Sequence, residues 1–238
     1  MSRTYNQDCV LAYALDLLGE RWTMLIIREL FLGPRRFGDL HVALSGLGTN
    51  LLSKRLKELE EAGLIVAPTP AETRGQYRLS ETGEELRPTI HALMFWSIEY
   101  FMGRPDPCPP KDCIFSNDLQ PDSVALALEL FINKCATPFS NYVLHLHIDG
   151  HPYTYYYMNS EMTARRGVDA PAVARIDSDV ASLMQAMRSE LYIPQIKERV
   201  TMSGDEAVLH HFLSGMMPGA QVADEVARKI AASASLHA

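Results

Sequence analysis

Residues 49–62 have the sequence TNLLSKRLKELEEA, and this stretch decides the fold of the first part of the chain. Leucines at 52, 56 and 59 recur at helical spacing and would form one apolar stripe facing a core. The opposite side carries polar and cationic residues near the N-terminal end of the helix, namely Asn50, Ser53, Lys54 and Lys57. A helix that enters the major groove of DNA presents its N-terminal residues to base edges, so this polarity fits a recognition helix. An ordinary amphipathic surface helix with mixed charges would give the same pattern.

The flanking segments favour the first interpretation. Three apolar or amphipathic helices are predicted before this stretch, at residues 9–18, 22–31 and 37–44. After it come an extended run, a turn-rich segment, an alternating strand and a long helix, at residues 63–66, 69–75, 76–79 and 84–101. This order predicts a winged helix-turn-helix. The loop with Arg74 would be the wing, placed to contact the phosphate backbone or a minor groove.

The first hundred residues resemble the HxlR family of bacterial regulators. The resemblance rests on CVLAYALDLLGERWTMLIIRELFLGPRRFGDLHVALSGLGTNLLSKRLKELEEAGLI followed by YRLSETG, with GERW, LGPRRF and L-x-x-RL-x-x-LE-x-x-GL as the specific pieces. It covers roughly residues 8–100. It implies a homodimer whose interface is built largely from the first helix and the helix that ends near Phe101. It also implies binding to double-stranded DNA, with residues 49–62 as the recognition helix.

Two positions depart from the family pattern. Gly48 stands where the family usually has a serine before the recognition helix, and glycine is a tolerable N-cap. The wing is shorter than usual, and its first strand has VAPTP where family members tend to carry Arg or Lys. Arg74 matches the usual wing arginine. Fewer phosphate contacts are therefore implied, with a shallower salt dependence of binding.

The predicted DNA-binding residues are Thr49, Asn50, Ser53, Lys54, Lys57, Arg74 and Arg36. Arg35 and Arg36 follow Gly33-Pro34 at the entry to the first helix of the motif, and either a phosphate contact or a solvated surface position fits them.

Cys9 has two interpretations. In several HxlR relatives, an N-terminal cysteine near this place senses oxidants or electrophiles. Nearby Arg or Lys would depress a thiol pKa, but here Asp8 precedes Cys9 and apolar residues follow it. A structural role is favoured, and a redox sensor stays open.

A boundary lies at residues 103–122, GRPDPCPPKDCIFSNDLQPD, where prolines interrupt the apolar periodicity. The predicted organisation is a DNA-binding and dimerisation domain, a semi-rigid linker, a second domain and a C-terminal helix or tail, at residues 1–103, 104–121, 122–218 and 219–238.

The second domain is predicted to be α+β, with an antiparallel sheet covered by helices on one side. Strands are expected at residues 142–149, 153–158, 161–165 and 172–176, with Asp149-Gly150 as a hairpin turn. Helices are expected at residues 122–133, 177–189 and 193–199, and a last one after Ser203-Gly204-Asp205 that runs to about residue 216. The chain as a whole is therefore mainly α with an α+β part.

The segment 122–217 resembles the lipid-binding domain of sterol carrier protein type 2. The resemblance rests on the pieces ARIDSDVASLMQAM and RVTMSGDEAVLHHFL. The resemblance implies an apolar tunnel between sheet and helices, suited to a lipid-like or flat hydrophobic small molecule. By pattern, the candidate pocket residues are Phe131, Leu144, Leu146, Met184, Met187, Met202, Phe212 and Met216. Each of them could equally fill a core.

No enzymatic activity, cofactor or metal is predicted. His145 and His147 share a strand face with His151 nearby, and this set could hold a metal, but the face opposite an apolar strand face is normally solvated. Neither a G-x-S-x-G elbow nor a glycine-rich phosphate loop is present.

Composition predicts a globular cytoplasmic protein without a membrane span. The chain of 238 residues is 47% hydrophobic, has no window of eighteen apolar residues, and begins without a signal-peptide pattern. Its net charge of -7 disfavours DNA binding by charge alone, but residues 105–238 carry most of the acidity. None of the four cysteines forms a Cys-x-x-Cys pair, so reduced thiols are expected.

Three functional hypotheses follow. The first is a homodimeric DNA-binding transcription regulator controlled by an apolar effector in the second domain. The second is a redox-sensing regulator that uses Cys9, with a purely structural second domain. The third is a lipid-binding or enzymatic second domain tethered to a weak DNA-binding scaffold.

Overall fold

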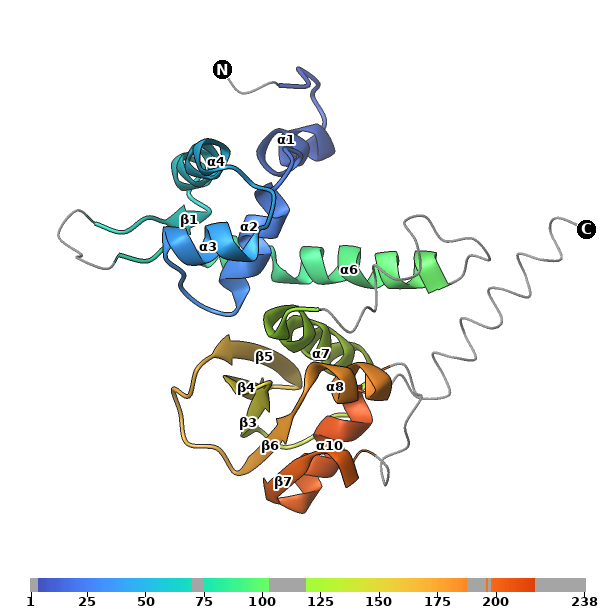
Figure 1. Ribbon diagram of the computed structural model, residues 1–238. Coiled ribbons are helices and arrows are strands. Elements are labelled where there is room, and N and C mark those ends of the chain that lie inside the picture. Colours follow the sequence, from blue (N-terminus) through green and yellow to red (C-terminus); the bar gives the residue numbers. More distant parts are fainter. Residues whose placement is uncertain (1–3, 70–74, 103–118, 188–195, 197, 217–238) are drawn as a thin grey trace, which may run out of the picture. The chain divides into compact units, whose positions relative to one another are not determined.

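The computed structural model describes residues 4–69, 75–102, 119–187, 196 and 198–216 (Figure 1). The chain separates into two compact units, Met1–Ala92 and Leu93–Ala238. The predicted wing tip, most of the linker, most of the helix predicted at 193–199 and the tail at 219–238 lie outside the described residues. Among the described helices, none is long and apolar enough to cross a membrane.

The first unit has the element order of a winged helix-turn-helix, as predicted. Its elements are α1 (Val10–Leu18), α2 (Thr23–Phe31), α3 (Phe37–Ala43), α4 (Thr49–Glu61), β1 (Ile65–Val66), β2 (Arg78–Leu79), α5 (Glu81–Glu84) and α6 (Arg87–Met102). Helix α6 continues across the boundary between the two units. The single helix predicted at 84–101 is thus preceded by a separate short helix, α5.

A small apolar core holds the first unit together. Ile26 and Ile27 of α2, Leu40 of α3 and Leu52 of α4 have no exposed surface. The stripe predicted on α4 is confirmed, because Leu56 and Leu59 are also buried.

The base of the wing is a short three-stranded arrangement. Strands β1 and β2 are antiparallel, with Ile65 opposite Leu79. Arg35 and Tyr77 exchange two backbone hydrogen bonds, Arg35 N to Tyr77 O at 2.9 Å and Tyr77 N to Arg35 O at 2.8 Å. The entry to α3 is therefore fixed to the wing.

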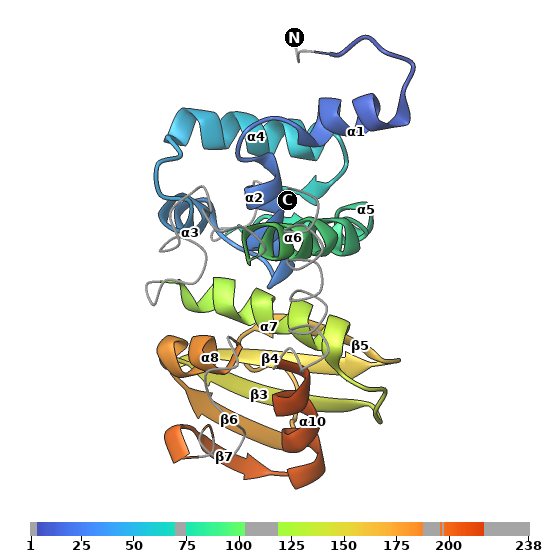
Figure 2. The same ribbon diagram turned by 90° about the vertical axis from the view of Figure 1, so that its right-hand side faces the viewer.

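The second unit is a five-stranded sheet with helices on one face (Figure 2). Its elements are α7 (Pro121–Cys135), β3 (Tyr142–Ile148), β4 (His151–Met158), β5 (Glu161–Arg166), β6 (Ala174–Ser178), α8 (Val180–Met187), β7 (Thr201–Gly204) and α10 (Glu206–Met216). The sheet order is β5-β4-β3-β6-β7. Pro121, predicted as linker, is the first residue of α7, where a proline costs no helical hydrogen bond.

The prediction of a wholly antiparallel sheet is wrong, because β3 and β6 are parallel, with Leu144 opposite Ala174. The reason is the connection after β5. Strand β5 lies at one edge and β6 pairs on the far side of β3, so residues 167–173 cross the sheet and bring β6 in with the direction of β3.

The crossing segment changes the environment of the sheet face opposite the helices. The His145 imidazole Nε2 lies 2.8 Å from the Ala170 carbonyl oxygen, and the Thr154 hydroxyl donates to Gly167 O at 2.8 Å. His145 is accordingly half-buried rather than solvated, and His147 is half-buried beside Arg175 and Asp177 of β6.

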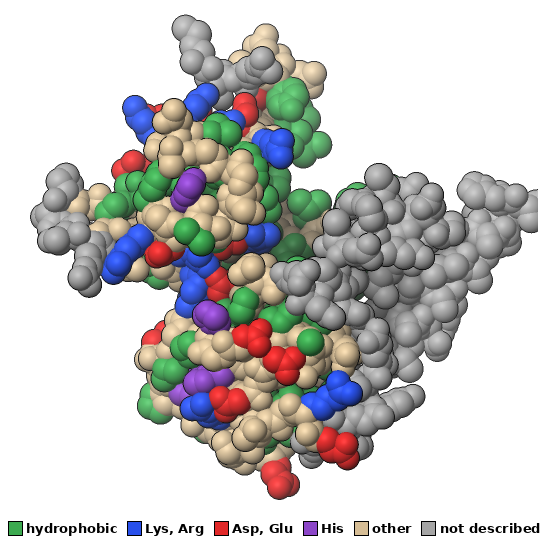
Figure 3. Space-filling view, in the orientation of Figure 1, with side chains coloured by type: hydrophobic (Ala, Val, Ile, Leu, Met, Phe, Trp, Pro, Cys, Tyr) green, Lys and Arg blue, Asp and Glu red, His purple; other side chains and the backbone are tan. Residues whose placement is uncertain are grey.

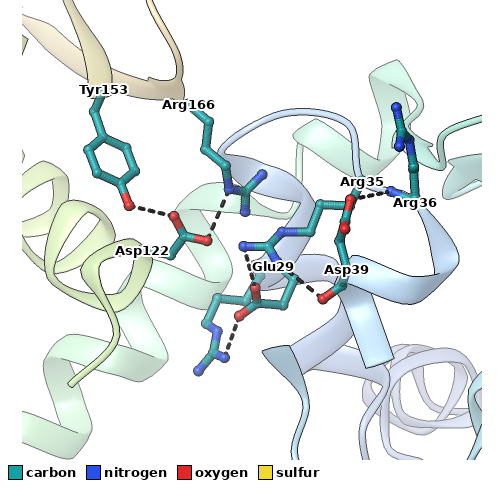
Figure 4. A network of polar contacts seen from close by, with 8 residues as sticks. Glu29, Arg35, Arg36, Asp39, Asp122, Tyr153 and Arg166 are labelled. Carbon is teal, nitrogen blue, oxygen red and sulfur yellow. Dashed lines mark hydrogen bonds and ion pairs between the residues drawn. The ribbon is translucent and has the colours of Figure 1, made fainter. Parts of the chain in front are cut away.

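Helix α7 satisfies the outer edge of β5 with its side chains. The Asn133 amide pairs with both backbone groups of Met162, at 2.9 and 2.6 Å, and the buried Glu129 carboxylate accepts from Ala164 N at 2.8 Å. Asp122 accepts from the Tyr153 hydroxyl at 2.6 Å and from Arg166 Nε at 3.0 Å (Figure 4). An edge covered in this way is protected from pairing with another chain.

The helix predicted at 177–189 begins later, because Ala174–Ser178 belongs to β6. Asp179 then caps α8, with its carboxylate accepting from Ser182 N at 2.7 Å.

Candidate nucleic-acid interface

Helix α4 presents the predicted contact residues together on its outward face. Thr49, Asn50, Ser53, Lys54 and Lys57 are all exposed, while Leu52, Leu56 and Leu59 are buried behind them. Gly48 precedes the helix with extended backbone and provides no side-chain cap. The first turn of α4 therefore offers backbone N–H groups, hydroxyl and amide groups on one surface.

The two lysines of this face are held loosely. Lys54 Nζ lies 3.7 Å from Glu58, and Lys57 Nζ lies 3.6 Å from Glu61. The lysine side chains are 63% and 73% exposed, so each pair contributes little stability. A phosphate group could replace either glutamate as the partner.

The two arginines at the entry to α3 have different surroundings (Figure 4). Arg35 is half-buried, and its guanidinium lies 3.2 Å from the carboxylate of Glu29, a residue only 4% exposed that also pairs with Arg28. Arg36 is exposed, and its backbone N donates to the Asp39 carboxylate at 3.3 Å. Arg36 is therefore the one whose side chain faces solvent. Arg74 lies outside the described residues.

One charged residue of α4 escaped the sequence analysis. Arg55 is 6% exposed and pairs with Glu20 and Glu58, at 2.5 and 2.6 Å. The signal was present, since Arg55 stands three residues after Leu52 and four before Leu59, on the apolar stripe itself. The contact joins the GERW and RL pieces of the sequence.

The SETG segment, residues 80–83, caps α5 with its serine and lets α5 lie close to β1 with its glycine. The Ser80 hydroxyl accepts from Gly83 N at 3.0 Å, capping α5, and donates to Gly63 O at 2.6 Å. A Cβ at Gly83 would lie 2.0 Å from the Leu64 carbonyl oxygen, so α5 can approach β1 this closely only with glycine at 83.

Helix α1 exposes an apolar surface. Cys9, which immediately precedes α1, is exposed and has a free thiol. The large exposed apolar side chains of α1 are Val10, Leu11, Tyr13 and Leu17.

The candidate pocket residues of the second unit lie between the sheet and its helices. Seven are buried, and Met202 is half-buried. The seven are Phe131, Leu144, Leu146, Met184, Met187, Phe212 and Met216.

The histidines of the second unit have separate partners. His147 Nδ1 lies 3.1 Å from Arg175 and 3.2 Å from Asp177, and burial together with the Arg175 charge lowers the pKa of His147. His151 Nδ1 lies 3.3 Å from Ile148 O. Within the described residues, no group of three or more His, Cys, Asp or Glu is arranged to hold a metal ion.

Charge is distributed rather than concentrated on the visible face of the molecule. In Figure 3, the described Lys and Arg side chains form separate clusters, with acidic side chains between several of them.

The fold and the outward face of α4 define the class of winged helix-turn-helix proteins. A family model described as HxlR-like helix-turn-helix matches residues 17–104. The uncharacterized HTH-type transcriptional regulator Rv3095 of Mycobacterium tuberculosis is 47% identical over 100 residues, which are 41% of this chain and 62% of that protein. The uncharacterized HTH-type transcriptional regulator YvaP of Bacillus subtilis is 37% identical over 89 residues, 37% of this chain and 82% of that protein. The chain belongs to the HxlR-like helix-turn-helix family.

A third relative is the HTH-type transcriptional regulator YodB of Bacillus subtilis. It is 31% identical over 103 residues, 42% of this chain and 86% of YodB. The solved reduced form of YodB aligns with a TM-score of 0.37 at 30% identity, over 44% of this chain and 100% of that structure. The matched part of the chain thus spans less than two thirds of Rv3095 but most of YvaP and YodB.

Proposed function

We propose that this protein is a transcription regulator, not an enzyme, that binds double-stranded DNA by inserting α4 into the major groove. The observation that carries the proposal is that α4 is amphipathic. Its leucine stripe is buried, and its opposite face exposes Asn50, Ser53, Lys54 and Lys57. Asparagine and serine can bond base edges, and lysines can hold phosphates or guanine. Thr49 and Arg36 lie at the N-terminal ends of α4 and α3 and would position the backbone of the duplex.

The test is DNA binding by the full chain. Duplexes enriched from a random pool by the wild type serve as the ligand. We expect Lys54→Ala combined with Arg74→Ala to abolish binding at physiological salt, because both cations contact DNA in the proposed complex. Lys134→Ala, an exposed lysine of the second unit, is the matched control and should bind normally. Unchanged affinity of the double variant would refute the proposal.

A homodimer is part of the same proposal. The exposed apolar side chains of α1 favour burial against a second copy, and a two-fold dimer would place two recognition helices on a pseudo-palindromic site.

We propose that the second unit binds an apolar small molecule and thereby shifts the relative setting of the two winged helices. What supports this is the resemblance to the sterol-carrier domain and the methionine-containing apolar layer between sheet and helices. Native mass spectrometry of the purified protein is the test. A co-purifying apolar ligand at a fixed stoichiometry is expected, and ligand-free protein whose DNA affinity does not respond to added lipids would contradict the effector hypothesis.

The alternative regulator is a thiol sensor at Cys9. The observation in its favour is the exposure of this thiol beside α1. Under this alternative, Cys9→Ser abolishes the response of DNA binding to diamide or quinones. Under the apolar-effector hypothesis, the same substitution leaves the effector response intact.

A further inference from the structure

Arg55 is a buried cation on the helix that we propose to read DNA. Its Nη2 lies 2.5 Å from Glu20 Oε2, its Nη1 lies 2.6 Å from Glu58 Oε2, and its Nε donates to the Arg21 backbone oxygen at 3.4 Å. Only 8% of the side chain is exposed. An arginine that is desolvated to this extent is destabilising unless it is paired, so its position is tied to these acceptors.

Two of the three acceptors belong to the turn between α1 and α2. Backbone hydrogen bonds hold this turn against the ends of the two helices. Gly19 N donates to Leu15 O at 2.7 Å, and Thr23 N donates to Glu20 O at 3.1 Å. Trp22 has a φ of 81°, a left-handed conformation that is rare for a bulky residue and persists only when its surroundings enforce it. Arg55 therefore attaches α4 to a fixed reference point.

The third acceptor connects Arg55 to the outward face. Glu58 contacts Arg55 with Oε2 and Lys54 with Oε1, the latter at 3.7 Å. Glu20, Arg55, Glu58 and Lys54 thus form a chain of alternating charges from the α1–α2 turn to a proposed DNA contact. The position of Lys54 is therefore coupled to that of Arg55 through the shared Glu58 carboxylate.

We infer that Arg55, through Glu20, is a positioning residue for sequence recognition. It fixes the orientation of α4 on the α1–α2 turn without touching DNA. The inference rests on the proposed function. Hydrogen bonds to base edges fail over a fraction of an ångström, whereas attraction to phosphates decays slowly with distance. Loosening α4 should therefore reduce discrimination between sequences and leave general DNA affinity nearly intact.

The experiment compares a duplex enriched by the wild type with a scrambled duplex, using the full chain over a range of salt concentrations. The variants are Glu20→Gln, Arg55→Lys and the double variant, with urea unfolding measured in parallel. Glu20 is suitable because its side chain is 42% exposed, so its neutral isostere should leave the fold intact. Lysine at 55 keeps the charge but cannot reach both acceptors as a fork. Glu60→Gln, an exposed glutamate on the same helix, is the matched control.

We expect each single variant to bind the enriched duplex about tenfold more weakly, the equivalent of roughly one base contact. Binding to the scrambled duplex and the salt slope should stay unchanged, because no phosphate contact is lost. The double variant should be no worse than Arg55→Lys alone, since that substitution already weakens the Arg55–Glu20 contact that Glu20→Gln removes. The direction of the affinity change separates positioning from charge. Removing an acidic charge near DNA by itself tightens binding to both duplexes, so Glu60→Gln should at most bind both duplexes more tightly.

An unchanged ratio of the two affinities in folded Glu20→Gln and Arg55→Lys would overturn the inference, as would additive losses in the double variant. Failure of the proposed function has a different signature. In that case the wild type itself would not prefer any enriched duplex over the scrambled one.

Discussion

Lys57 shows how a single residue of α4 could serve DNA binding without stabilising the protein. Its side chain is 73% exposed and its only described ion pair is the 3.6 Å contact with Glu61. Exchanging this partner for a phosphate costs little and releases a counterion. Lys57 is therefore expected to contribute to DNA affinity and not to the stability of the fold.

We expect Lys57→Ala to weaken binding to enriched and scrambled duplexes alike. The slope of log affinity against log salt concentration should fall by about 1. Titrations of both duplexes at four salt concentrations measure the slope, and unfolding in urea should show no change. An unaltered slope would remove Lys57 from the set of phosphate contacts.

His91 of α6 illustrates a buried titratable group. Burial, and secondarily the charge of Arg87, lower the pKa of His91 to about 4. The folded state therefore resists protonation of this ring, while the unfolded chain binds a proton below its ordinary pKa of about 6.5. Stability should fall as pH drops from about 6.5 towards 4.

Replacing His91 by glutamine should remove this contribution. At pH 5 the wild type should lose about 2 kcal/mol of unfolding free energy through His91 relative to pH 7, and the variant should lose that much less. Urea unfolding of both proteins at the two pH values gives the comparison. Parallel pH dependences of wild type and variant would contradict the assignment.

At the scale of elements, the long periodic helices and the winged motif were predictable, because their apolar spacing and turn residues are local signals. Arg55 was not identified, since its partner Glu20 is 35 residues away and a cation on an apolar stripe has no local explanation. The parallel pairing of β3 with β6 was also missed. It depends on which edge of the sheet residues 167–173 lead to, and single-strand periodicity carries no information about that.

The contact between α5 and β1 provides an element-scale prediction. Gly83→Ala would place a Cβ 2.0 Å from Leu64 O, and we expect overpacking to lower the unfolding free energy by about 1–3 kcal/mol. Gly38→Ala is the control, because nothing lies within 4 Å of a Cβ there and alanine favours helix α3. Thermal and urea unfolding measure both, and equal stability of the two variants would show that α5 can move aside.

For the whole molecule, the apolar surface of α1 predicts assembly into dimers. A glutamate at Leu11, which is 63% exposed, would be harmless in a monomer but would be buried in the proposed interface. We expect Leu11→Glu to sediment as a monomer at concentrations where the wild type is dimeric. Val173→Glu, at a valine that is 53% exposed in the second unit, should remain dimeric.

The net charge of -7 also has a consequence at this scale. A chain with this charge gains little from general attraction to DNA. Specific contacts of α4 must therefore supply most of the discrimination between DNA sequences. The central claim is therefore that individual side chains of α4 recognise bases.

Selection of duplexes from a random pool, performed in parallel with the wild type and with Asn50→Ala, tests that claim most directly. Asparagine recognises adenine through two hydrogen bonds, so its loss should relax the enriched sequence at one position of each half-site and leave the remaining positions intact. Identical enriched sequences from the two proteins would contradict the assignment of α4 as the recognition helix.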